Sequence, residues 1–232
     1  MTPTQQGSMR LFRFSGITVF LHWSWFVVAM WTFQNRTGLY SSMVWNAVEY
    51  MGLFVIVLMH EFGHSLSCRQ VGGRADLIVL WPLGGVAYVA PPPRPGATLW
   101  SIAAGPLVNV ALIPVFILAQ KFTLGNPSIS DDTSTLIQQL AHINLGLLIF
   151  NVLPIYPLDG GQILRSLLWF VIGPVKSLLV ATFIGFLGAA GLAYLALEWK
   201  SIWVGIMAVF MFMNCRAAWN HARAMSAQMD LR

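Results

Sequence analysis

The sequence predicts an all-α membrane protein with about six transmembrane helices and one short β-hairpin that dips into the membrane. Hydrophobic residues make up 57% of the 232 residues and charged residues only 9%, whereas soluble domains contain roughly 25% charged residues. Apolar runs close to the ~20 residues of a membrane span recur along the chain. Short loops separate these runs, so residues 1–232 are predicted to form a single intramembrane domain.

A helix rises about 1.5 Å per residue, so a membrane span needs about 20 apolar residues. Six segments of the chain are predicted spans on this basis. Their approximate bounds are 17–33, 44–68, 99–120, 136–172, 175–197 and 202–215. The fourth segment is broken at 154–161, where prolines and glycines interrupt the helix. The polar residues after 215 are predicted to leave the membrane as a frayed helix.

The segment Ala75–Ala90 is apolar but too short to cross a membrane. Its Val, Ile, Leu and Tyr residues flank Pro82 and Gly84-Gly85, which indicates two short strands around a turn. Non-helical backbone is tolerated at membrane depth only where protein or a water-filled cavity covers it. We therefore predict that this hairpin dips into the helix bundle.

The distribution of basic residues predicts a cell-membrane protein with both termini in the cytoplasm. An even number of spans places both termini on one side. With that side cytoplasmic, only Arg36, Lys121 and Lys200 of the 13 Lys and Arg residues face outwards, as the positive-inside rule requires. The net charge of +5 is explained by these loops, so we expect the lipid bilayer as a partner and no nucleic acid.

Residues 60–64 read His-Glu-Phe-Gly-His and lie inside the second predicted span. Positions i and i+4 share one helix face, so His60 and His64 can bind one metal ion. Glu61 then lies beside the metal as a general base for water. An ionisable side chain in lipid costs at least ~2.5–3.5 kcal/mol, so three of them in one span indicate a function.

A catalytic zinc site usually has three protein ligands and a water molecule. Among the eight acidic residues, only Glu61 and Asp159 fall deep in apolar surroundings. Asp159 lies at the break of the fourth span, where a carboxylate can turn inwards. We therefore predict that His60, His64 and Asp159 bind one Zn²⁺ per chain, with Glu61 taking a proton from the attacking water.

Other interpretations of these residues remain open. His22 and His142 are alternative third ligands, although His22 beside two tryptophans is more typical of an interfacial residue. His142 is more typical of a polar contact between helices. Asp159 alone could instead cap a helix or pair with Arg165.

Two asparagines lie within predicted spans and need hydrogen-bond partners. Asn109 follows a Gly-Pro pair in the third span, and Asn144 lies in the fourth. Either could donate a hydrogen bond to the oxyanion of a tetrahedral intermediate or contact the substrate. The alternative is a hydrogen bond between helices, and the sequence does not decide between the two.

Four motifs in this order resemble the site-2 protease family of intramembrane zinc metalloproteases. They are residues 60–64, the Pro-Leu-Gly-Gly at 82–85, the Ala-Gly-Pro-Leu-Val-Asn at 104–109, and residues 151–161 with their Leu-Asp-Gly core. The resemblance covers roughly residues 17 to 216 and is to a compact form without PDZ or CBS domains. It implies a six-span core and the zinc ligands and base predicted above.

The resemblance also implies a substrate and a partner enzyme. The expected reaction is hydrolysis of a peptide bond within or near the transmembrane segment of a single-span membrane protein, in regulated proteolysis. The substrate is often first trimmed by another, site-1-type protease. A helical substrate must unwind before cleavage, and the hairpin offers an edge for strand addition. Leu83, Gly84, Gly85 and Val86 are predicted to pair with it.

Two other classes of function are considered. A membrane metal transporter would also place His and Asp in spans, but would usually line a path with several sites, and this chain has one cluster. A catalytically silent relative would bind substrate without cleaving it, and the presence of Glu61 argues against that.

Overall fold

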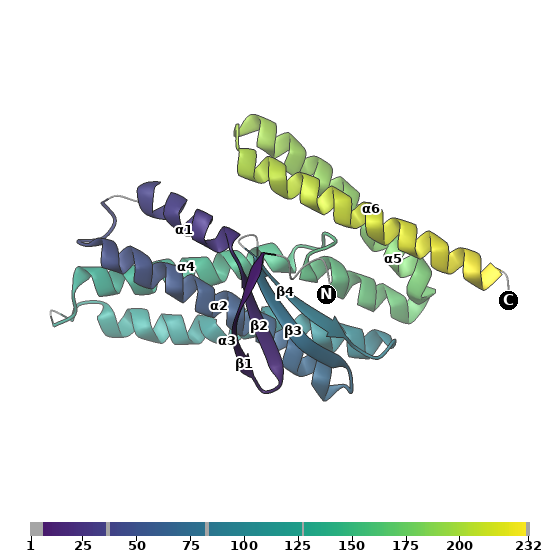
Figure 1. Ribbon diagram of the computed structural model, residues 1–232, viewed down its shortest axis with the longest axis horizontal. Helices are drawn as coiled ribbons and strands as arrows, with labels where there is room; N and C mark the ends of the chain where they lie inside the picture. Colours follow the sequence, from purple (N-terminus) through teal and green to yellow (C-terminus); the bar gives the residue numbers. More distant parts are fainter. Residues whose placement is uncertain (1–6, 36–37, 82–83, 127, 231–232) are drawn as a thin grey trace. The chain divides into compact units, whose positions relative to one another are not determined.

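The computed structural model describes residues 7–35, 38–81, 84–126 and 128–230 (Figure 1). The described residues form four strands and six helices. In chain order these are β1 (Ser8–Phe14), β2 (Ile17–His22), α1 (Ser24–Asn35), α2 (Met43–Gln70), β3 (Arg74–Trp81), β4 (Gly84–Ala90), α3 (Pro95–Thr123), α4 (Asp131–Val152), α5 (Asp159–Glu198) and α6 (Ile202–Asp230).

Five helices within the described residues are long and apolar enough to cross a membrane, namely α2, α3, α4, α5 and the Ile202–Ala227 part of α6. The prediction of a continuous helical span at 17–33 is wrong. Residues Ile17–His22 form strand β2, and α1 has only 12 residues, against the ~20 needed for a span. Hydropathy alone cannot distinguish an apolar strand followed by a short helix from one transmembrane helix.

The predicted fourth and fifth spans are divided differently in the structure. α4 ends at Val152 and α5 begins at Asp159, which confirms the break predicted at 154–161. α5 then continues to Glu198, with a kink at Gly173, whose φ is 80°, directly before Pro174. The predicted boundary between residues 172 and 175 is therefore this kink. α6 continues beyond the predicted end at 215 as far as Asp230.

The chain divides into two compact units, each described by itself. The first contains Met1–Pro92 and Ala104–Ile149, and the second contains Pro93–Ala103 and Phe150–Arg232. The first unit therefore holds α1, α2, the strands and most of α3 and α4. The second holds α5, α6, the first turns of α3 and the last residues of α4.

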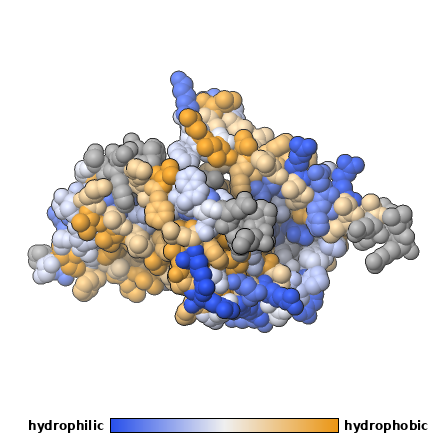
Figure 2. Space-filling view, viewed as in Figure 1, coloured by the Kyte–Doolittle hydropathy of each residue, from blue (hydrophilic) through white to orange (hydrophobic). Residues whose placement is uncertain are grey.

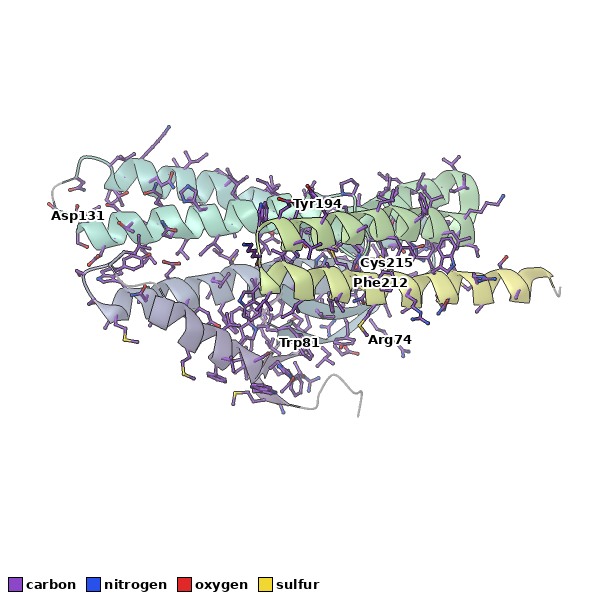
Figure 3. The ribbon with its side chains drawn as sticks, turned by 90° about the horizontal axis from the view of Figure 1, so that it is seen from above. Arg74, Trp81, Asp131, Tyr194, Phe212 and Cys215 are labelled. Carbon is purple, nitrogen blue, oxygen red and sulfur yellow. The ribbon has the colours of Figure 1, made fainter. Side chains whose placement is uncertain are left out.

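The first unit contains a four-stranded sheet in the order β1-β2-β3-β4. The predicted hairpin is confirmed, since β3 and β4 pair antiparallel with Trp81 opposite Gly84; Arg74 and Trp81, the ends of β3, are labelled in Figure 3. β1 and β2 were not predicted. They form a hairpin around Ser15-Gly16, where both residues have positive φ, as a type I′ turn requires. β1 has a register shift between Arg10 and Phe12.

The direction of β2 and α1 relative to α2 follows from contacts at the end of α2. β2 runs parallel to β3, with Thr18 opposite Leu77. A guanidinium nitrogen of Arg69, in the last turn of α2, donates to the carbonyl oxygen of Ser15, and another donates to Asp76 at 3.0 Å. β2 therefore starts at the C-terminal end of α2. The chain from β2 through α1 then runs opposite to α2.

One face of the sheet packs on α2 and forms the core of the first unit. Ile17 and Val19 alternate on β2, as Ile78 and Leu80 do on β3, so each pair points to the same face. All four are fully buried together with Val57 of α2. This packing fixes the sheet against the helix that carries the His-Glu-Phe-Gly-His motif.

Glycines shape the break before α5 in the second unit. A Cβ atom added at Gly160 or at Gly161 would lie closer than 3.0 Å to the backbone of Val152 or of Tyr156, respectively. The segment at residues 153–158 can therefore fold back against the first turn of α5 only because these positions lack side chains.

α5 and α6 pack together in the second unit through aromatic and small residues. Phe186 lies edge-on to Phe212 at 5.4 Å between ring centroids and near Trp219 at 6.3 Å. Elsewhere in both units, large hydrophobic side chains are exposed, and they cover much of the face shown in Figure 2. On α3, Leu118 and Phe122 are 66% and 72% exposed. Such surfaces are expected where side chains face lipid.

Candidate metal centre

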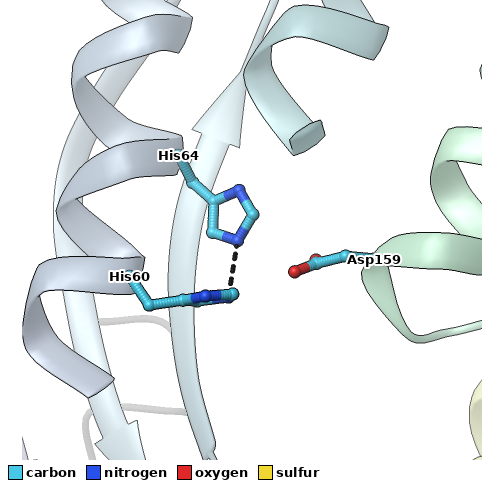
Figure 4. A group of neighbouring side chains, drawn as sticks. All are labelled: His60, His64 and Asp159. Atoms are coloured by element: carbon cyan, nitrogen blue, oxygen red, sulfur yellow. Dashed lines mark hydrogen bonds between the residues drawn. The ribbon is translucent and has the colours of Figure 1, made fainter. Parts of the chain in front are cut away.

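Helix α2 places both histidines of the motif on one buried face. His60, Glu61 and His64 are 3%, 5% and 5% exposed. The Nε2 atoms of His60 and His64 lie 3.1 Å apart (Figure 4), and their rings are nearly perpendicular. The helical spacing of four residues therefore brings two imidazole nitrogens to one point.

This arrangement fits a zinc ion. Zinc binds histidine nitrogen at ~2.0–2.1 Å with tetrahedral geometry, which places two such nitrogens about 3.3 Å apart. The separation of 3.1 Å between the two Nε2 atoms agrees with that value. Two imidazoles and a carboxylate are a donor set that favours zinc.

Helix α3 approaches the histidine rings closely because of small residues. A Cβ atom added at Gly105 would lie closer than 3.0 Å to the Nε2 atoms of both His60 and His64. A Cβ atom added at Gly63 of α2 would meet the carbonyl oxygen of Ala104 in the same way. Small residues such as Gly105 predict close helix packing near the site, and in the structure this glycine lies against the two histidine rings themselves. The position of Gly105 within the Ala-Gly-Pro motif at 104–106 is the sequence feature that points to this residue.

Asn109 and Asn144 form a hydrogen-bonded chain that ends at His60. The Nδ1 atom of His60 lies 2.6 Å from Oδ1 of Asn109. Nδ2 of Asn109 donates to Oδ1 of Asn144 at 2.8 Å, and Nδ2 of Asn144 donates to the backbone oxygen of Asn109 at 3.0 Å. Both asparagines therefore make the contact between helices that was one of the two interpretations, and the chain of hydrogen bonds reaches His60.

Strand β4 holds the predicted general base. The backbone N–H of Ala87 donates to Oε2 of Glu61 at 2.8 Å. A Cβ atom added at Gly85 would lie closer than 3.0 Å to the Glu61 carboxylate. Ala87 was not foreseen, and Gly85 was predicted only as a substrate contact. Of the residues predicted to pair with substrate, Gly84, Gly85 and Val86 are in β4, and Leu83 lies outside the described residues.

Asp159 belongs to the second unit, where it is the first residue of α5 and is half-buried; its side chain is drawn in Figure 4. The first turn of a helix carries positive partial charge, which favours a carboxylate there in its ionised form. This is the form that binds metals. The break before α5 therefore presents Asp159 at a helix start, as the prolines and glycines indicated.

The alternative third ligands have other surroundings. The ring of His22 stacks on Trp81 at 4.0 Å between centroids, and its Nδ1 atom lies 2.5 Å from Oγ of Ser24. His142 is exposed on α4. Within the described part of the chain, the group of residues that could hold a metal ion includes neither of them.

Comparisons with known proteins identify relatives of this chain. The family model described as Peptidase family M50 matches residues 49–131 and 114–195. A zinc metalloprotease of Methanocaldococcus jannaschii is 35% identical over 178 residues, which cover 77% of this chain and 50% of the relative. The Rip3 protein of Mycobacterium tuberculosis is 32% identical over 169 residues, or 68% of this chain and 42% of Rip3.

A solved structure has the same fold. The site-2 protease from Methanocaldococcus jannaschii aligns with a TM-score of 0.67 and 29% sequence identity, covering 91% of this chain and 95% of that one. The matched region spans half or less of the length of the two relatives found by sequence. The family model covers more than half of this chain, and it includes α2 with both histidines and the start of α5 with Asp159. The chain therefore belongs to Peptidase family M50.

Proposed function

We propose that this protein is an intramembrane zinc metalloprotease that hydrolyses a peptide bond within or near the transmembrane segment of a membrane protein. The observation that carries this proposal is the pair of histidine Nε2 atoms 3.1 Å apart on a membrane-length apolar helix, beside a buried Glu61. The relatives support it, since one is named a zinc metalloprotease and the similar structure is a site-2 protease.

The proposed metal ligands are His60, His64 and Asp159, with one zinc ion per chain. Each of these residues offers one ligand atom to a group that could hold a metal ion. The separation of the two histidine nitrogens and the helix-start position of Asp159 support the assignment. A zinc ion held by these residues would lower the pKa of a bound water molecule towards ~7 and would polarise the substrate carbonyl.

Glu61 is the proposed general base. It accepts a proton from the attacking water and passes it to the amine that leaves. The N–H of Ala87 fixes one carboxylate oxygen at 2.8 Å, so the side chain is held in place before substrate arrives. Because Glu61 is only 5% exposed, bulk water is largely excluded from its carboxylate.

The edge of β4 opposite its pairing with β3 is the proposed place where unwound substrate pairs. Neighbouring residues of a strand direct their N–H and C=O groups to alternate sides. The N–H of Ala87 faces Glu61, so the backbone groups of Gly85 face the same edge and those of Val86 face β3. The proposed substrate is a single-span protein, trimmed beforehand by a site-1-type protease as in the family that the motifs resemble.

Five apolar helices and the family make this chain a multi-pass membrane protein. We further propose that it lies in the cell membrane with both termini in the cytoplasm. If Met43 lies outside, five crossings by the apolar helices bring the C-terminus inside. β2 and α1 together run opposite to α2, which brings the N-terminus inside as well. The basic residues Arg10, Arg13 and Arg69 then face the cytoplasm.

Replacing Glu61 by Gln tests the proposed activity. The purified protein is incubated with zinc and a tagged single-span substrate whose span contains Gly or Pro, which weaken helices. Loss of the base should lower the cleavage rate by about 10²–10⁴-fold, while metal analysis still finds one zinc per chain.

Glu49→Gln is the matched control, because Glu49 is also buried on α2 but accepts a hydrogen bond from Tyr40 at 2.7 Å. A glutamine oxygen can accept the same bond, so cleavage should be retained. Equal cleavage by Glu61→Gln and the unaltered protein would contradict the proposed mechanism. Loss of zinc in Glu61→Gln would also contradict the assignment of Glu61 as base rather than ligand.

A further inference from the structure

The hydrogen bonds among Asn144, Asn109 and His60 have only one consistent direction. A backbone carbonyl oxygen can only accept, so the Asn144 atom 3.0 Å from the backbone oxygen of Asn109 must be its amide nitrogen. The side-chain oxygen of Asn144 therefore faces Asn109. Only the amide nitrogen of Asn109 can donate to it, at 2.8 Å.

This order determines the protonation of His60. With its nitrogen directed at Asn144, Asn109 presents Oδ1 to Nδ1 of His60 at 2.6 Å. An amide oxygen is an acceptor only, so Nδ1 of His60 must carry a hydrogen. In a neutral imidazole the proton is then absent from Nε2. Rotating the Asn109 amide would instead place two acceptor oxygens 2.8 Å apart, which is unfavourable.

The contact with the second histidine agrees with this tautomer. An unprotonated Nε2 of His60 accepts a hydrogen bond, and Nε2 of His64 lies 3.1 Å from it. The Nδ1–H tautomer is also the form in which Nε2 binds a metal ion, because the lone pair of Nε2 is available for coordination. The same nitrogen thus faces His64 and is ready to act as ligand.

We infer that Asn109 and Asn144 are positioning residues that hold His60 in its Nδ1–H tautomer, with Nε2 directed at the metal position. The inference rests on the proposed function, since it assigns His60 as a zinc ligand. It differs from the role in oxyanion or substrate binding that the sequence left open for both residues. In this arrangement three helices, α2, α3 and α4, jointly set the state of one ligand.

Burial explains why side chains, rather than water, hold the tautomer of His60; we call the hydrogen bonds from Asn144 through Asn109 to His60 the relay. Asn109 is 0% exposed and Asn144 1%, so water cannot readily replace either hydrogen bond. In many metal sites a carboxylate accepts the proton of the ligand histidine. A carboxylate at residue 109 would be a charge buried in a dry environment, where its cost is high. A neutral amide fixes the tautomer without that charge.

Three variants test the relay. Asn109→Leu removes the acceptor and should release His60 from the Nδ1–H form. Asn109→Asp keeps an acceptor oxygen next to Nδ1 and should preserve the tautomer. Asn144→Leu leaves the acceptor but frees the Asn109 amide to rotate, so an intermediate effect is expected. Asn214→Leu is the control, because Asn214 is only partly buried on α6 and donates to the backbone oxygen of Phe210.

The first measurement is the tautomer of His60 in the metal-free protein. Couplings between ring nitrogens and ring protons in isotope-labelled histidine distinguish the two neutral forms, and the chain has only five histidines. The signal of His60 is identified by its loss in His60→Gln. The Nδ1–H form is expected in the unaltered protein, in Asn109→Asp and in Asn214→Leu. A mixture of forms is expected in Asn109→Leu.

The second measurement is zinc affinity by competition with a chelator. Loss of such a partner typically weakens metal binding by about tenfold to a hundredfold. We expect this for Asn109→Leu, with Asn214→Leu close to the unaltered protein. An Nε2–H form of His60 in the unaltered protein would overturn the inference. Zinc binding and tautomer both unchanged in Asn109→Leu would do so too.

These outcomes are separable from failure of the proposed function. If the unaltered protein binds no zinc, the zinc protease assignment fails, whereas the tautomer of the metal-free protein still reports on the relay. If zinc binds with full affinity in every asparagine variant, the relay is wrong and the protease assignment stands. Should Asn109→Leu not fold, a shifted tautomer population in Asn144→Leu supplies the same test.

Discussion

At the residue scale, two glycines allow backbone to approach the reactive side chains more closely than any other residue would. Gly105 of α3 lies against the Nε2 atoms of both histidines, and Gly85 of β4 lies against the Glu61 carboxylate. In each case an added methyl group would overlap the functional atoms themselves. The two glycines therefore lie at different parts of the proposed site, one beside the proposed metal ligands and the other beside the proposed base.

Replacing each glycine by alanine should separate these two effects. Gly105→Ala should displace the histidine rings and lower zinc content well below one per chain. Gly85→Ala should leave zinc content unchanged but slow cleavage at least tenfold, since a general base typically contributes about 10²–10⁴-fold. Metal analysis and cleavage of the tagged single-span substrate measure the two effects.

Gly146→Ala on α4 controls for the introduction of alanine, because nothing lies within 4 Å of the added Cβ atom. Alanine favours a helix over glycine by ~1 kcal/mol, so this variant should be slightly more stable and fully active. Full zinc content in Gly105→Ala would show that the histidine rings have more room than the structure gives them.

At the element scale, β4 both holds Glu61 and forms one edge of the described sheet. If substrate adds to this edge as a strand, its side chains point alternately to the two faces. A cysteine at Val86, which is 42% exposed, should then form disulfides with substrate cysteines at alternate positions around the cleavage site. Glu61→Gln in the same chain keeps the substrate uncleaved during the experiment.

Val44→Cys provides the comparison, since Val44 is 69% exposed on α2 but lies about 24 Å along the helix from His60 at 1.5 Å per residue. The natural cysteines, Cys68 and Cys215, are both buried and should contribute little background. Crosslinks at every consecutive substrate position, or equally strong ones from Val44→Cys, would rule out pairing along β4.

At the scale of the whole molecule, the proposed orientation predicts which side each terminus occupies. A fluorescent protein that matures only in the cytoplasm should be bright when fused to either terminus in a bacterial host. Alkaline phosphatase, which is active only outside the cytoplasm, should be inactive at both positions.

Phosphatase inserted after Thr123, at the end of α3, should be active, because α3 carries the chain outwards in the proposed orientation. Activity of a C-terminal phosphatase fusion would reverse the assignment. The N-terminal fusion tests separately whether β2 and α1 together bring the chain across the membrane.

Much of this fold is predictable from the sequence because its signals are local. The apolar length of α2, and the Pro residues before Asp159 together with the Gly residues after it, each determine an element within a few residues. The β-branched residues around Gly84-Gly85 predict the hairpin in the same way. The first predicted span failed because Ile17–His22 is as apolar as a transmembrane helix. The signal that was missed is Ser15-Gly16, a turn pair before an apolar strand.

The parts of the site that could not be predicted depend on contacts between distant segments. The four-residue spacing of His60 and His64 suffices to place both on one helix face. No local pattern in the sequence predicts that Asn109 contacts His60, or that Ala87 contacts Glu61. Those contacts are 49 and 26 residues apart in the chain, and they follow only from how α3 and the sheet pack on α2.

The edge formed by β1 has a consequence for which chains this sheet can accept. β1 is exposed along almost its entire length, carries Arg10 and Arg13, and is irregular between Arg10 and Phe12. Charged side chains and bulges are features that keep sheet edges from recruiting further strands. An extended segment that arrives at β1 would have to bury two guanidinium groups next to an interrupted ladder. Of the two edges of the described sheet, β1 is therefore the one that disfavours a new strand, and β4, the proposed site of pairing, is the one beside Glu61.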